Sequence, residues 1–210
     1  MRSESRAARR PAGRAARSRK PVSAEAPERH RAVKKGRNPE RLPEIPFRHD
    51  VRPGDGETVR EIVAATGYFA PAEVDVAVEL VQENLAKGAA ASGYHFIFVE
   101  HGARPIAYLC YGPIPCTVSS HNLYWIAVHP DHQGRGLGKA LMREAEKLIR
   151  AAGGTRIYID TSYKAQYEDT RAFYLSLGYE LDALLKDFYS PGDDKVIYRK
   201  LLGAPAFPFR

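Results

Sequence analysis

This chain of 210 residues has no long hydrophobic run. Its longest apolar stretches, such as Ile106–Tyr111 and Leu123–Val128, fall far short of the roughly 18 residues that cross a bilayer, so we expect a soluble protein without a membrane partner. Cysteine is rare: the chain has only Cys110 and Cys116, which form no CxxC motif, and no second pair exists. This excludes a disulfide scaffold and a four-cysteine zinc site, and it favours a reducing, cytoplasmic location.

An excess of one charge is missing from most of the chain. Residues 1–50 hold 15 Lys and Arg against 6 Asp and Glu, a net charge of +9, whereas residues 51–210 hold 17 against 19, a net charge of −2. The composition predicts a disordered basic tail over 1–45, one domain over 46–203 and a short C-terminal tail over 204–210. A solvated tail is the simplest interpretation, and a nucleic-acid-binding arm or an organelle presequence are its alternatives.

Strand and helix signals alternate from Phe47 onward. The expected strands are 47–52, 94–100, 105–111, 122–128, 156–160, 179–189 and 196–201. The expected helices carry Val59 to Val63, run from Pro71 to Lys87-Gly88, run from near Leu137 to Gly153-Gly154, and cover 169–177. This order predicts a mixed α/β fold, with a central mixed sheet flanked by helices in one domain.

A glycine-rich segment joins a buried strand to an amphipathic helix. Pro130 breaks the strand, and Gln133-Gly134-Arg135-Gly136-Leu137-Gly138-Lys139 opens the helix. Glycines allow positive φ and close backbone approach, while the helix dipole adds roughly half a positive charge at the N-terminus, so the segment predicts an anion site. It is no Walker loop, because Ala140 follows Lys139, and no dinucleotide fingerprint, because its last glycine comes one residue early.

Two motifs resemble the GNAT superfamily of acetyl-CoA-dependent N-acetyltransferases, over about residues 47–202. They are Ile126-Ala127-Val128-x-Pro130-x-x-Gln133-Gly134-x-Gly136-x-Gly138 and Thr170-Arg171-Ala172-Phe173-Tyr174-x-x-x-Gly178-Tyr179. The resemblance implies a GNAT-like domain that takes acetyl-CoA as acetyl donor and needs no metal. It also implies that the loop amides bind the CoA pyrophosphate, that the strand bonds the pantetheine arm, and that a strand N–H polarises the thioester carbonyl. The cofactor residues implied are Ile126, Ala127, Val128, Gln133, Gly134, Arg135, Gly136, Gly138 and Lys139.

The resemblance also implies catalytic residues. Tyr174 lies at the family's general-acid position, where a phenol with a pKa of about 10 would protonate the departing thiolate; packing at a helix end is the alternative. Asp160 lies where several members carry a catalytic Glu, but a carboxylate with a pKa near 4 is a poor base unless burial or a relaying water assists it. The base therefore stays open. Tyr167 replaces the asparagine usual seven residues before the tyrosine, so acceptor contacts cannot be transferred.

Other polar and aromatic residues are weaker candidates. Tyr111 and Tyr189 are predicted to line the acceptor cleft, with packing as an equal alternative. His129 and His132 are three residues apart, but the flanking proline and the CoA loop argue against zinc. Cys116 has no assignable partner for nucleophilic catalysis.

The sequence therefore predicts direct acetyl transfer from acetyl-CoA to a primary amine of a small molecule or an amino acid. No activated nucleophile is evident, so no covalent acyl-enzyme is expected. Peptide N-terminal acetylation is the alternative, because Asp187-Phe188-Tyr189 with Lys195-Val196 is similar to the terminal hairpin of those enzymes. A non-catalytic CoA-binding or nucleic-acid-associated module is a further one. Either a monomer or a homodimer is compatible with the sequence.

Overall fold

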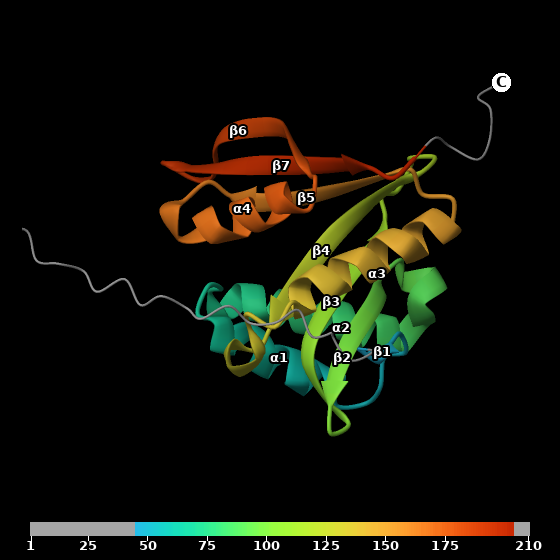
Figure 1. Cartoon of the computed structure of the whole chain (residues 1–210). Helices are drawn as coiled ribbons and strands as arrows, with labels where there is room; N and C mark the ends of the chain where they lie inside the picture. Colours follow the sequence, from blue (N-terminus) through green and yellow to red (C-terminus); the bar gives the residue numbers. More distant parts are fainter. Residues whose placement is uncertain (1–44, 204–210) are drawn as a thin grey trace, which may run out of the picture. The chain divides into compact units, whose positions relative to one another are not determined.

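The computed structural model describes residues 45–203 (Figure 1), so the predicted tails lie outside the described residues, apart from Ile45. Seven strands form one sheet in the order β1-β2-β3-β4-β5-β7-β6. Strands β4 and β5 run parallel, and all other neighbours are antiparallel. This mixed sheet with flanking helices confirms the predicted fold class. No helix among the described residues is long and apolar enough to span a membrane.

The elements follow the expected order. The strands are β1 Phe47–Arg48, β2 His95–His101, β3 Arg104–Pro113, β4 Ser120–Val128, β5 Arg156–Ser162, β6 Glu180–Ser190 and β7 Asp193–Leu201. The helices are α1 Asp55–Thr66, α2 Pro71–Ser92, α3 Leu137–Ala151 and α4 Glu168–Ser176, with short 3-10 turns η1 Pro130–His132 and η2 Ala165–Tyr167.

Several predicted boundaries are wrong, including the start of the last strand, which begins at Asp193 rather than at residue 196. Three others show the reasons. The first strand ends at Arg48 rather than at residue 52, because only its first two residues pair with β2. The second helix does not end at Gly88, which instead forms a kink (φ 75°, ψ 163°) before the helix resumes. The strand predicted over 156–160 continues to Ser162, because Thr161 and Ser162 still pair with β7.

The helices cover the two faces of the sheet and create two apolar cores. Along β2, Ile97 and Val99 point to the core that contains residues of α3 and α4, and Phe96 and Phe98 point to the core that contains residues of α1 and α2. This alternation is the two-residue period of a strand buried on both faces. Figure 1 shows α3 and α4 on the near face and α1 and α2 behind the sheet.

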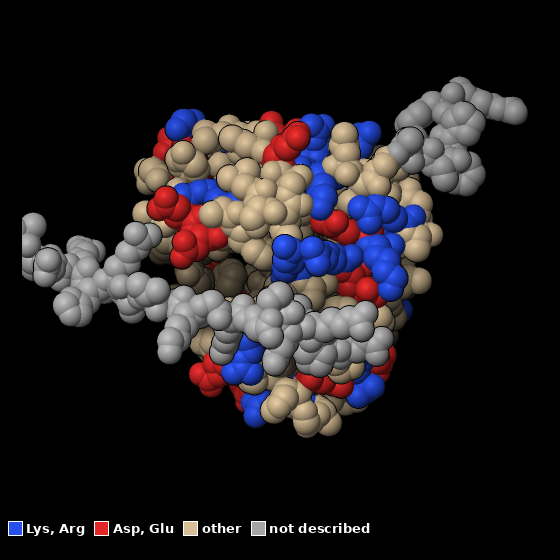
Figure 2. Space-filling view, viewed as in Figure 1, with Lys and Arg blue, Asp and Glu red and all other residues tan. Residues whose placement is uncertain are grey.

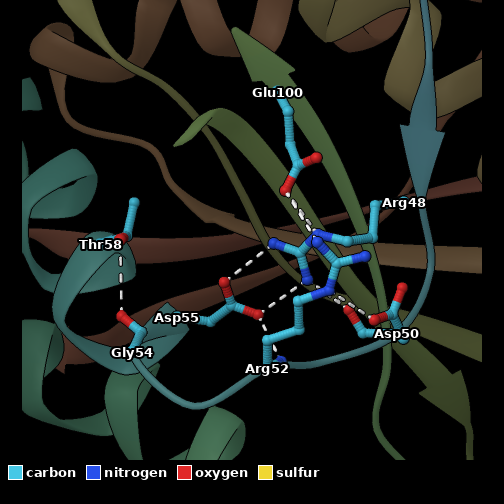
Figure 3. Close-up of polar contacts among 7 residues, drawn as sticks. All are labelled: Arg48, Asp50, Arg52, Gly54, Asp55, Thr58 and Glu100. Atoms are coloured by element: carbon cyan, nitrogen blue, oxygen red, sulfur yellow. Dashed lines mark hydrogen bonds and ion pairs between the residues drawn. The ribbon is translucent and has the colours of Figure 1, made fainter. Parts of the chain in front are cut away.

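A buried ion pair fixes the start of α1 to the sheet (Figure 3). The Arg48 guanidinium donates two hydrogen bonds of 2.8 Å to the Asp55 carboxylate and one of 2.6 Å to Glu100. The side chains of Arg48 and Asp55 are each only 6% exposed. The bidentate geometry matches the planar fork of arginine to a carboxylate. Because Asp55 opens α1, the network positions that helix against β1 and β2.

Candidate active site

The sheet opens between β4 and β5. The two strands pair only from Ser120 to Leu123 on β4 and from Arg156 to Ile159 on β5, and β4 then continues to Val128 beside β3 alone. Figure 1 shows the two strands diverging, and Figure 2 shows a hollow in the surface below α4 in the same view. Because backbone groups need partners, the edge of β4 that faces the opening can pair with an extended ligand.

The segment Ile126–Val128 forms this free edge. Its opposite edge pairs with Ala107, Tyr108 and Leu109 of β3. A bulge at Cys110 and Tyr111 shifts the register, so that Cys110 faces Trp125 whereas Tyr111 faces Leu123. On the opening side, no strand among residues 45–203 pairs beyond Leu123.

The loop after β4 builds the N-terminus of α3. Gly134 and Gly136 have φ of 71° and 81°, which favours glycine at both positions. The Gln133 side-chain amide donates to the Val128 carbonyl oxygen at 3.0 Å, and the Arg135 guanidinium donates to the Asp131 carbonyl oxygen at 3.0 Å. The first bond holds the loop against the end of β4, and the second connects two residues within the loop.

The first turn of α3 carries free amides. The first hydrogen bond of the helix runs from the Ala140 N–H to the Gly136 carbonyl oxygen (3.0 Å), so the N–H groups of Leu137, Gly138 and Lys139 precede it. No side chain of residues 45–203 caps the helix at Gly136. The helix dipole and Lys139 add positive charge, which suits a phosphate. A Cβ at Gly138 would lie 3.4 Å from the Phe173 ring, so glycine allows α3 to approach α4 closely.

Tyr174 of α4 lies in the core on the α3 and α4 side. The residue is 4% exposed, and its ring centroid lies 6.0 Å from that of Tyr198 and 6.2 Å from that of Tyr179. Within residues 45–203, its hydroxyl has no hydrogen-bond partner. Burial raises the pKa of this phenol well above its ordinary value near 10. The phenol therefore stays protonated at neutral pH.

Asp160 of β5 lies just past the last residue pair of β4 and β5. It forms an ion pair with Lys195 of β7, whose ammonium also lies 4.6 Å from the centre of the Phe188 ring. Tyr189 of β6 lies near this pair. Burial, followed by the negative charges of Asp160 and Asp193, raises the pKa of Tyr189 to about 12. The structure thus brings two predicted residues, Asp160 and Tyr189, into one group.

The model of the acetyltransferase (GNAT) family matches residues 60–179, more than half of the chain. The chain belongs to the GNAT acetyltransferase family. A Desulfovibrio desulfuricans protein assigned to the GNAT acetyltransferases is 46% identical, with a TM-score of 0.74, and the match covers 75% of this chain and 99% of that one. No curated protein matches.

Two further solved structures show the shared fold at lower identity. An aminoglycoside 6′-N-acetyltransferase complexed with coenzyme A is 14% identical, with a TM-score of 0.60 and coverage of 77% of this chain and 99% of that one. The ribosomal-protein-S18-alanine N-acetyltransferase from Escherichia coli is 16% identical, with a TM-score of 0.59 and coverage of 78% and 99%. The GNAT fold therefore supports acceptors of quite different chemistry.

The structure does not bring Tyr111 into the group around Asp160. Tyr111 lies opposite Leu123 on β3, within the core under α3, where its ring stacks on His95 at 5.2 Å. Burial and the charge of Glu144 raise the pKa of Tyr111 to about 12. Leu123 and Ile159 share that core, so Asp160, the next residue of β5, points to the other face. An acceptor contact by Tyr111 stays a prediction.

Tyr167, which occupies the position of the asparagine usual in the GNAT pattern, contacts the loop between α1 and α2. Its hydroxyl donates to the Tyr68 carbonyl oxygen at 3.1 Å, and the two rings lie 5.7 Å apart. Tyr68 belongs to the loop between α1 and α2, whereas Tyr167 ends η2, so the contact joins segments 99 residues apart. Sequence reasoning missed this contact, and it also missed the ion pair between Lys195 and Asp160. No local signal connects such distant residues.

Asp193 and Asp194 at the start of β7, and His129 in the loop after β4, have charged partners. Asp193 pairs with Lys164 at 2.8 Å, and Asp194 pairs with Lys186 at 2.7 Å. These cations, together with hydrogen bonds, lower the pKa of both aspartates. His129 Nδ1 lies 3.7 Å from the Asp131 carboxylate. Within the described part of the chain, no group of three or more His, Cys, Asp or Glu side chains could hold a metal ion.

Proposed function

We propose that this GNAT protein transfers an acetyl group from acetyl-CoA directly to the primary amine of a small molecule or an amino acid. The observation that carries the proposal is the combination of the free β4 edge with the uncapped amides of α3 at one end of it. An extended chain that ends in phosphates fits this arrangement. The proposed binding residues are Ile126, Ala127, Val128, Gln133, Gly134, Arg135, Gly136, Gly138 and Lys139.

Each part of this site has its own role in the proposal. Bound acetyl-CoA supplies an acetyl thioester as the electrophile. The amides of Gly134 to Lys139 hold the pyrophosphate, and the guanidinium of Arg135 and the ammonium of Lys139 add to the positive field. The backbone of Ile126–Val128 pairs with the pantetheine arm, and one of its N–H groups polarises the carbonyl.

The reaction also needs two proton transfers. An acceptor amine with a pKa near 10 is only about one-thousandth neutral at pH 7, a cost of roughly 4 kcal/mol. Asp160 receives the ammonium proton through a relaying water, and Lys195 holds its carboxylate in place. Tyr174 donates a proton to the departing thiolate, because burial keeps its phenol protonated.

A peptide α-amine is the second candidate acceptor. Phe188, next to Tyr189 on the β6–β7 hairpin, lies 4.6 Å from the Lys195 ammonium that pairs with Asp160, so we assign the hairpin to the acceptor side of the site. An acceptor screen that follows thiol release from acetyl-CoA, with small amines, amino acids and peptides, distinguishes the two classes. Turnover with peptides alone would overturn the preference for small amines.

A matched pair of glycine variants tests the cofactor assignment. Acetyl-CoA at about 100 times its Kd should stabilise the wild-type protein by roughly 2.7 kcal/mol, which a thermal melt detects. Gly136→Asp should abolish this shift, because a carboxylate then lies where the phosphates bind. Gly153→Asp is the control, since Gly153 also has positive φ (85°) but follows the other end of α3.

The control separates loss of binding from backbone strain. Both substitutions place a β-carbon at a left-handed position and should lower the melting temperature of the free protein. Only Gly153→Asp should keep the full acetyl-CoA shift. A Gly136→Asp protein that is folded and stabilised by acetyl-CoA like the wild type would contradict the assignment.

A further inference from the structure

A pocket of about 410 Å³ borders Asp160 on the sheet face opposite α3 and α4. Its lining residues come from the β3–β4 loop, β4, β5 and β7, and they are Ile114, Pro115, Asn122, Tyr124, Tyr158, Asp160 and Ile197. The alternation of the strands places them there, because the neighbours Leu123, Ile159, Val196 and Tyr198 all belong to the core on the other face. The pocket therefore lies outside the proposed acetyl-CoA site but shares Asp160 with the proposed catalytic group.

The lining is mostly apolar, and its polar groups are the Asn122 amide, the Asp160 carboxylate and the hydroxyls of two tyrosines. Ile114, Pro115 and Ile197 supply aliphatic surface, and the two tyrosines supply ring faces. Among the lining residues from the described part of the chain, Asp160 alone is charged, and Lys195 pairs with it. The Tyr124 ring packs edge-to-face against Tyr94, with centroids 5.2 Å apart, which fixes one wall.

We infer that this pocket binds an apolar group carried by the acceptor amine, while the amine itself lies at Asp160. The inference rests on the proposed function and narrows its substrate class. An alkyl or aryl group gains by leaving water for this lining, whereas a second charge has no counter-ion there and loses its hydration. The apolar group belongs either to a free amine or to the first side chain of a peptide.

Two amines of equal chain length give the first test. Both have five carbons; pentylamine ends in a methyl group, whereas cadaverine carries a second ammonium on its fifth carbon. The kcat/KM for pentylamine should exceed that for cadaverine by at least about tenfold, since apolar pockets discriminate by that factor or more for a single group. Shortening the alkyl chain should lower kcat/KM stepwise, by roughly fourfold or more per methylene. Equal values for pentylamine and cadaverine would overturn the inference.

A negative charge added to the pocket lining gives the second test. Asn122→Asp keeps the side-chain shape but adds a carboxylate to the lining, so the ratio of pentylamine to cadaverine should fall by at least about tenfold. The control is Val118→Asp, because Val118 is 87% exposed on the same β3–β4 loop and does not line the pocket. The control should keep the wild-type ratio. Equal changes in both variants would show that only the general field of the protein matters.

A second variant guards against failure of Asn122→Asp to fold. Ile197→Ala enlarges the pocket, so the preferred alkyl chain should become longer, and an unchanged optimum would count against the pocket. Peptides that begin with leucine or with lysine identify the source of the apolar group. A leucine preference without turnover of pentylamine assigns the pocket to a peptide, and no preference within either pair overturns it.

A binding measurement separates this inference from the proposed function. Pentylamine added without acetyl-CoA should shift the NMR resonances of the Asn122 side-chain amide and leave the backbone amide of Val118 unchanged. Shifts at Asn122 in a protein that acetylates no amine would refute the proposed function and keep the pocket. Acetylation without shifts at Asn122, at saturating pentylamine, would refute the pocket alone.

Discussion

Replacement of Tyr174 by phenylalanine tests the proposed proton donor. The substitution keeps the ring contacts with Tyr179 and Tyr198, and it removes a hydroxyl that bonds to none of residues 45–203. The melting temperature and the Kd for acetyl-CoA should therefore stay close to wild type. Loss of the general acid should lower kcat by roughly 10²–10⁴-fold, a barrier increase of about 2.7–5.4 kcal/mol.

Tyr179→Phe is the matched control for this prediction. It removes the same atom from the neighbouring ring, whose hydroxyl donates to Glu146 at 3.3 Å inside the core. Loss of that bond should cost about 1 kcal/mol, which lowers the melting temperature by about 2–4 °C in a domain of this size. Its kcat should not change. If the roles are as proposed, Tyr174→Phe lowers kcat without lowering the melting temperature, and Tyr179→Phe lowers the melting temperature without lowering kcat.

Single-turnover kinetics provide the decisive assay, with an amine found in the acceptor screen. Rapid mixing under conditions where chemistry limits the rate reports the proton-transfer step, and calorimetry reports the Kd for acetyl-CoA. A folded Tyr174→Phe enzyme with the wild-type rate would refute the assignment. The proton would then come from water or from another tyrosine.

Three further predictions concern stability and domain boundaries. Arg48→Met leaves Asp55 buried without its partner and should cost about 3–5 kcal/mol in a urea titration, and a loss near zero would disprove a stabilising role. Burial lowers the pKa of His95 and His121 from 6.5, so the unfolded chain binds more protons below that pH. Stability should be complete above about pH 6.5 and decrease as the pH falls toward 5; a flat profile would contradict this. Deletion of residues 1–44 should leave the Kd for acetyl-CoA unchanged in calorimetry, and a large loss would show that the domain begins earlier.

Most of the fold could be predicted because its signals are local. The glycines at 134 and 136 require positive φ where the loop turns into α3, and the periodicity of Leu141, Ala145 and Ile149 marks the buried face of that helix. Such signals need only neighbouring residues, so they place strands, helices and the anion loop in order. The strand boundaries that failed depend on distant partners. The extension of β5 to Ser162, for example, needs β7 beside it.

The sequence by itself determined the order of the elements, the glycine loop and the resemblance to GNAT enzymes. The tertiary structure decided which side chains meet at the site. It places Lys195 beside Asp160, and it places Tyr111 on the face of the sheet opposite to Asp160. Strand pairing and the bulge at Cys110 and Tyr111 set this register. A register change of one residue moves a side chain to the other face of the sheet. Residues far apart in the chain therefore form the proposed acceptor side, and only the pairing of the strands brings them together.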